Sequence, residues 1–192
     1  MGNFSNKSAT RRSLPQHLGT GLMALSLGLT GWVISNSAQA DTGAKDVQVI
    51  LKSIGFLASK PSGDVVVNVI YDPANADSKK DADAIKALLD GAKGGAISPN
   101  AKLVGTDQLA GLDGLAAIVA AGVSPAGLDA MAAAAKGKKV LTISTDPACA
   151  KAGKCILSVH SEPKVEILFS AATAQAAGVE FLPTFRMMIT EL

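Results

Sequence analysis

The sequence is poor in aromatic residues, in histidine and in cysteine. Its 192 residues include one tryptophan, one tyrosine, five phenylalanines, two histidines and two cysteines. So few rings leave little to stack on nucleic acid bases, and no lysine and arginine cluster follows the amino-terminal segment to neutralise a phosphate backbone. The composition therefore argues against a nucleic acid partner.

Sequence motifs of common enzymes are also absent. The chain has no G-x-S-x-G elbow, no G-x-x-x-x-G-K-[ST] loop and no H-E-x-x-H pair. His160 is the one histidine after residue 40, and a histidine without partners at a strand end is more often a plain surface residue than a general base. We expect no catalytic residue, no cofactor and no metal ligand set.

The first forty residues have the pattern of an export signal. Lys7, Arg11 and Arg12 precede a mostly apolar stretch at 18–34, and Ala38-Gln39-Ala40 is a small-x-small cleavage site. This pattern predicts cleavage after Ala40, a periplasmic location and no stable membrane insertion afterwards. An uncleaved anchor is the alternative, and the paired arginines leave a twin-arginine route open beside general secretion.

Removal of the signal changes the charge of the protein. The chain has 18 Lys plus Arg and 16 Asp plus Glu, and the signal holds three of the basic residues and no acidic one, so residues 41–192 carry 15 minus 16, or −1. Those 152 residues are the length of one ordinary domain. We predict a single domain over 41–192.

The two cysteines lie close together, in a segment that can turn back on itself. Pro147 and Gly153 flank or interrupt the stretch between Cys149 and Cys155. In an oxidising compartment such a pair predicts a disulfide. Metal binding is the alternative, which the spacing and the lack of nearby ligands disfavour.

Hydrophobic periodicity predicts alternating strands and helices. The expected helices are 46–57, 78–89 (capped by Ser78), 124–136, 171–177 and 182–192, and the expected strands are 64–71, 102–104, 115–119, 140–143, 155–159 and 164–169. Alternation of this kind implies parallel pairing with right-handed crossovers. The predicted fold is a single open three-layer α/β sandwich, with a mostly parallel sheet and an antiparallel carboxy-terminal hairpin at its edge.

Three aspartates follow predicted strands. Asp72, Asp107 and Asp146 each lie at the end of a proposed strand, after Tyr71, Thr106 and Thr145. Because ligands bind beyond the carboxyl ends of parallel strands, the three could line one crevice for a ligand or a cation such as Mg²⁺. The alternative is turn formation, since Asp-Pro pairs occur at both Asp72 and Asp146.

The carboxy-terminal segment carries bulky apolar side chains. Phe185, Met187 and Met188 could form an adaptable surface for a partner. Packing of the same residues in the core is the alternative.

The order of these elements resembles the YfiR/HmsC-like periplasmic family. The likeness covers most of 41–192 and is greatest over 153–192, with a glycine before a strand, the charged strand 164–168, the small-residue helix 171–179 and an apolar terminal segment. The strand over 67–72 is similar too. Ser170 stands where family members commonly have an asparagine, and a second disulfide seen in relatives has no cysteines here.

The resemblance implies a non-catalytic regulator. Such a protein binds the periplasmic part of an inner-membrane diguanylate cyclase and restrains it, which links cyclic-di-GMP and biofilm formation to the envelope. It also implies a redox-sensitive role for Cys149 and Cys155. A periplasmic small-ligand-binding protein of a transport or sensing system is the second hypothesis, an enzyme built on Asp72, Asp107 and Asp146 is the third, and a homodimer is left open.

Overall fold

The computed structural model describes residues 42–92 and 95–192, so the predicted export signal lies outside the described residues. In chain order the α-helices, 3-10 helices (η) and strands are α1 (Ala44–Ile54), β1 (Gly63–Tyr71), α2 (Ala76–Asp90), β2 (Ile97–Gly105), η1 (Leu109–Gly111), β3 (Ala116–Val119), α3 (Pro125–Ala135), β4 (Leu141–Ser144), α4 (Pro147–Lys151), β5 (Leu157–His160), β6 (Glu166–Phe169), α5 (Ala171–Ala177), η2 (Pro183–Met188) and β7 (Thr190–Glu191).

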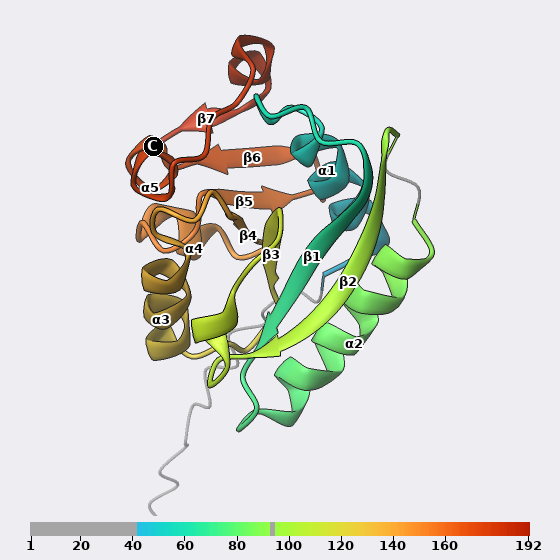
Figure 1. Cartoon of the computed structure of the whole chain (residues 1–192), viewed down its shortest axis with the longest axis vertical. Helices are drawn as coiled ribbons and strands as arrows, with labels where there is room; N and C mark the ends of the chain where they lie inside the picture. The colour runs from blue at the N-terminus through green and yellow to red at the C-terminus, as the bar shows by residue number, and fades with distance from the viewer. Residues whose placement is uncertain (1–41, 93–94) are drawn as a thin grey trace, which may run out of the picture. The chain divides into compact units, whose positions relative to one another are not determined.

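The strands of the described part form one seven-stranded sheet in the order β2-β1-β3-β4-β5-β6-β7 (Figure 1). Pairing is parallel from β2 through β5, antiparallel between β5 and β6, and parallel between β6 and β7. The predicted mostly parallel α/β sheet with its antiparallel hairpin is confirmed. The hairpin is not the outermost part of the sheet, because β7 pairs beyond β6.

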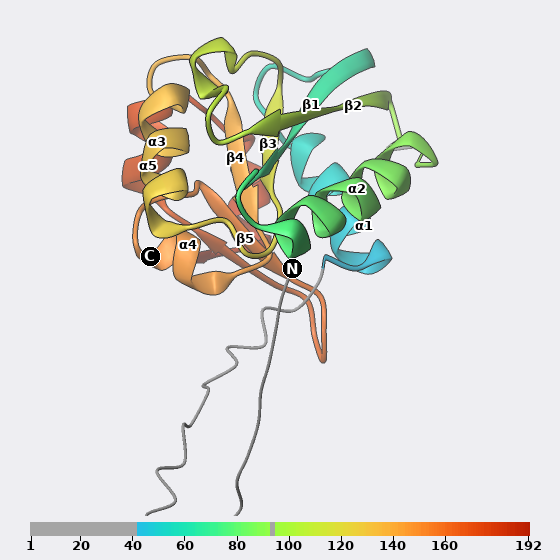
Figure 2. The ribbon, with the colours of Figure 1, turned by 90° about the horizontal axis from the view of Figure 1, so that it is seen from below.

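The sheet is covered by helices on both faces, which confirms the three-layer sandwich. Helices α1 and α2 lie on one side and α3, α4 and α5 on the other (Figure 2). In α1, Val47, Ile50, Leu51 and Ile54 recur at helical spacing, and all four side chains are buried. Burying such side chains contributes roughly 1.5–3 kcal/mol each, so this face holds α1 against the sheet.

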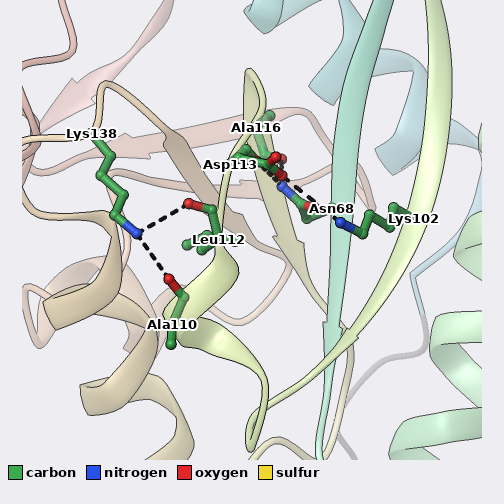
Figure 3. Close-up of polar contacts among 7 residues, drawn as sticks. All are labelled: Asn68, Lys102, Ala110, Leu112, Asp113, Ala116 and Lys138. Atoms are coloured by element: carbon green, nitrogen blue, oxygen red, sulfur yellow. Dashed lines mark hydrogen bonds and ion pairs between the residues drawn. The ribbon is translucent and has the colours of Figure 1, made fainter.

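The connection from β2 to β3 crosses the α3 side of the sheet without an α-helix (Figure 3). Buried Asn68 in β1 donates from Nδ2 to the carbonyl oxygens of Asp113 and Ala116. From the other side, Lys138 Nζ donates to the carbonyl oxygens of Ala110 at 3.4 Å and Leu112 at 3.2 Å. These contacts hold the crossing segment in place, and its Leu112 side chain is buried in the core on this side of the sheet.

Helix α2 begins earlier than the sequence predicts. Its cap is Asn75, whose Oδ1 accepts hydrogen bonds from the N–H groups of Asp77 at 3.0 Å and Ser78 at 3.3 Å. The predicted cap, Ser78, is instead a buried helical residue whose hydroxyl accepts the N–H of Asp72 at 3.1 Å. The prediction was wrong because asparagine and serine are both good caps, and the neighbouring β1 loop decides between them.

The carboxy-terminal segment is not the predicted α-helix. It forms the 3-10 helix η2 and then β7, which pairs with β6. The Leu182 N–H donates to the Phe56 carbonyl at 2.8 Å, and the Leu192 N–H to the Phe169 carbonyl at 3.0 Å. These two anchors draw the chain along the sheet edge, so tertiary contacts override the helical periodicity.

Candidate functional site

A hollow of about 930 Å³ lies at the carboxyl ends of β3, β4 and β5, and we call it the crevice. It is lined by residues 119–125 at the end of β3, by residues 144–149 at the end of β4, and by Asn75, Leu128, Asp129, Ala152, Lys154 and His160. The strand order reverses between β1 and β3, since β2 lies on one side of β1 and all later strands on the other. Open α/β sheets bind ligands beyond the carboxyl ends of their strands near such a reversal.

Two helices begin at the crevice, and each is capped by the side chain of the residue that precedes it. At α3, the Ser124 hydroxyl accepts the Gly127 N–H at 3.3 Å. At α4, Asp146 Oδ1 accepts the Ala148 N–H at 2.8 Å. Proline at the first position of both helices suits these starts, because its missing N–H would have no partner there.

Asp72 lies beside the start of α3. Its Oδ1 accepts the Ala74 N–H at 3.0 Å. That hydrogen bond, followed by one from the Ser124 hydroxyl, holds the pKa of the Asp72 carboxyl below its ordinary value. Asp72 is therefore an anion that joins the β1 loop to the start of α3.

The three predicted aspartates are not gathered into one site. Asp146 lines the crevice, whereas Asp72 and Asp107 are not among its lining residues. Residues 42–92 and 95–192 contain no group of three or more His, Cys, Asp or Glu side chains placed to hold a metal ion. The shared cation crevice is thus not formed by these three residues, and the hydrogen bonds of Asp72 and Asp146 are those of turn and cap residues.

Other polar residues of the crevice lie at or near strand ends, and the sequence alone did not assign them to this site. His160 ends β5, Ser144 ends β4 and Asn75 follows β1. Lys154 also lines the crevice and forms an ion pair with Asp129 of α3. The signal of His160, Ser144 and Asn75 in the sequence is the same as that of Asp146, a polar residue at or after a buried strand. Lys154 precedes β5 and has no such signal.

The predicted disulfide between Cys149 and Cys155 is present, with Cα atoms 5.3 Å apart. Both cysteines are buried in the core beneath α3, and Cys149 is part of the crevice wall. The bond joins the middle of α4 to the residue after Lys154, so it closes a loop that contains the end of α4 and Lys154. It therefore helps to shape one side of the crevice.

The predicted partner surface divides into a buried and an exposed part. Phe185 is only 1% exposed, and its ring stacks on Phe181 at 4.5 Å and on Phe56 at 5.4 Å between centroids. Met187 and Met188 are 84% and 48% exposed. Phe185 is therefore a core residue and cannot offer its side chain to a partner in this structure, whereas the two methionines can.

Comparisons with known proteins give the fold and no family. No family model and no curated protein matches the chain. A solved structure that it resembles is the ABC domain in complex with L-Trp from Streptococcus pneumoniae, at a TM-score of 0.54 and 14% identity. The match covers 76% of this chain and 61% of that one, so the chain spans about three fifths of its length. Within the described residues, no helix has the length and apolarity that a membrane crossing requires.

Proposed function

We propose that this chain is a non-catalytic, exported binding protein that holds a small organic molecule in the crevice. The observation that carries the proposal is the crevice itself, about 930 Å³ at the strand ends of a sheet whose order reverses nearby. A volume of this size suits a ligand of drug-like dimensions. Its walls combine apolar side chains such as Val119 and Leu128 with a few polar ones, which is the usual make-up of such sites.

Two further observations support the proposal. The fold resembles that of a protein whose structure was solved in complex with L-Trp, an organic molecule of a size that the crevice accommodates. The buried disulfide suits an exported protein, because disulfides persist in oxidising compartments.

The test is a calorimetric titration of L-Trp and a mass spectrum of the native protein, which is made with its own leader and purified from the periplasm. We expect heat of binding in the titration with L-Trp, or a co-purified small molecule in the mass spectrum. Ala148→Trp fills the exposed side of the crevice and should abolish either signal. Ala133→Trp, an equal change at an exposed position of α3 outside the crevice lining, should not. Retained binding in Ala148→Trp would contradict the crevice as the site.

A regulator that docks on a membrane protein is the second candidate. The exposed apolar side chains of Met187, Met188 and Leu192 favour it, because they are close in sequence, within residues 187–192. From the resemblance to the YfiR/HmsC-like family, the expected partner is the periplasmic part of an inner-membrane diguanylate cyclase.

That candidate is tested by capture from detergent-solubilised membranes of the source organism, with mass spectrometry of the captured proteins. A cyclase is expected with the native protein and not with Met187→Lys. The control is Val165→Lys, which makes the same kind of change at another exposed apolar side chain, 58% exposed in the β5–β6 hairpin. This variant should still capture the cyclase. Loss of capture under reductant would assign a switch to Cys149 and Cys155, and absence of any cyclase would reject the candidate.

A further inference from the structure

We infer that the crevice selects a small organic amine, whose ammonium group binds Asp146. This inference rests on the proposed binding function and names the chemical class of the ligand. It follows from the charge of the crevice and from which polar atoms there remain without partners.

The helix starts at the crevice do not offer an anion site. A helix N-terminus attracts anions through its free N–H groups and its dipole. At α3, however, Gly127 N–H is bonded to Ser124, and Ser124 is in turn bonded to the carboxylate of Asp72. The Gly127 N–H is thus used within the protein, and the carboxylate of Asp72 already places a negative charge beside this helix start. A phosphate or carboxylate ligand would be repelled by that charge.

The formal charge of the lining is negative. Asp129, Asp146 and Lys154 are its Asp and Lys residues, and one positive charge less two negative charges gives −1. Lys154 and Asp129 neutralise each other in their ion pair. The uncompensated charge is therefore that of Asp146.

Asp146 has an oxygen available for a ligand. Its Oδ1 accepts the Ala148 N–H, whereas Oδ2 has no hydrogen bond from any residue of the described part of the chain. Next to it, Ser144 is 4% exposed and its Oγ accepts the Asp146 N–H at 3.0 Å. A hydroxyl oxygen has two lone pairs, so Ser144 keeps one.

An ammonium group matches these acceptors. It has three donors and no acceptor, and it can share them between Asp146 Oδ2 and Ser144 Oγ. The apolar side chains of Val119, Val123 and Leu128 then surround the rest of the molecule. A carboxylate in the same place would face Asp146 directly.

The experiment compares three ligands with one ring system, namely tryptamine, L-Trp and indole-3-propionate, by calorimetry on the native exported protein. We expect tryptamine to bind at least about tenfold more tightly than indole-3-propionate, because its ammonium group can form a charge-assisted hydrogen bond to Asp146 and the carboxylate of the other ligand cannot. Asp146→Asn keeps the helix cap and removes the charge. It should weaken tryptamine about tenfold and leave indole-3-propionate no weaker.

The matched control is Asp113→Asn, which makes the same charge change before the amino end of β3, outside the crevice lining. It should leave tryptamine binding unchanged. Indole-3-propionate binding as tightly as tryptamine, or tryptamine binding unaffected by Asp146→Asn, would overturn the inference and leave the proposed function standing. No binding of any of the three, with no co-purified molecule, would reject both.

Discussion

Lys154 and Asp129 form an ion pair that joins the loop before Cys155 to helix α3. The two side chains are 38% and 56% exposed, and exposed pairs of this kind contribute at most about 1 kcal/mol. The disulfide from Cys149 to Cys155 constrains the same loop covalently. The crevice wall formed by α4 is thus held by two contacts, of which the disulfide is the stronger and the ion pair the weaker.

Replacement of both cysteines tests how much the disulfide stabilises the fold. We expect Cys149→Ala with Cys155→Ala to lower the free energy of unfolding by about 2 kcal/mol, because a short loop is no longer closed in the unfolded chain. Urea denaturation without reductant measures it. Lys154→Ala should cost no more than about 1 kcal/mol. A double variant as stable as the native protein would contradict a structural role for the disulfide.

Asn68 is the main polar anchor of the segment between β2 and β3, and its replacement gives a second prediction. Asn68→Ala removes the donors to the carbonyl oxygens of Asp113 and Ala116, and a buried carbonyl without a partner costs about 1–3 kcal/mol. We expect a loss of about 2 kcal/mol in urea denaturation.

The control for that change lies on the neighbouring strand. Lys102 is paired with Asp113 at 4.0 Å, and its side chain is 59% exposed (Figure 3). Lys102→Ala should therefore change stability by less than about 0.5 kcal/mol. Equal losses in the two variants would show that Asn68 does not anchor the segment.

Elements that depend on local sequence were predictable, and those that depend on strand order were not. The β-branched run that forms β1 and the alanine-rich helix α3 are found where the periodicity predicts them. The segment 182–192 has a helical apolar pattern but follows the sheet edge, because Phe185 packs against Phe56 and Phe181 from distant parts of the chain. No local pattern contains that information.

The same distinction applies to the site. The rule that ligands bind at strand ends selected Asp72, Asp107 and Asp146 alike. Only the sheet order shows that β1 and β2, which precede Asp72 and Asp107, lie on one side of the reversal, whereas the crevice lies over β3, β4 and β5. Sequence reasoning therefore found Asp146 and could not separate it from the other two, nor bring His160 and Asn75 to it.

Acid titration should reveal the contact between Asp72 and Ser124. The folded pKa of Asp72 is lowered, so its contribution to stability is present above the ordinary value of about 3.9 and is lost as the pH falls through the folded pKa. We expect Asp72→Asn to be less stable than the native protein at pH 7. The difference should shrink as the pH falls below about 4. Urea denaturation at a series of pH values measures this.

Ser124→Ala provides the comparison for the acid titration. It removes the hydroxyl donor but leaves the Ala74 N–H on the carboxylate, so the pKa of Asp72 should move back toward its ordinary value. The pH-dependent part of the stability should then be smaller than in the native protein. If the free energy of unfolding of Asp72→Asn differed from that of the native protein by the same amount at every pH, the ionisation of Asp72 would not be coupled to folding in this way.

The division of the carboxy-terminal segment into core and surface gives the last prediction. Phe185→Ala empties a site in the stack between Phe56 and Phe181, and such a change in a core typically costs about 3–5 kcal/mol. Met187→Ala alters a side chain that is 84% exposed and should cost less than about 0.5 kcal/mol. Urea denaturation of both variants measures the contrast. If Phe185→Ala were as mild as Met187→Ala, η2 would have to detach readily from the sheet, and Phe185 could then reach a partner after all.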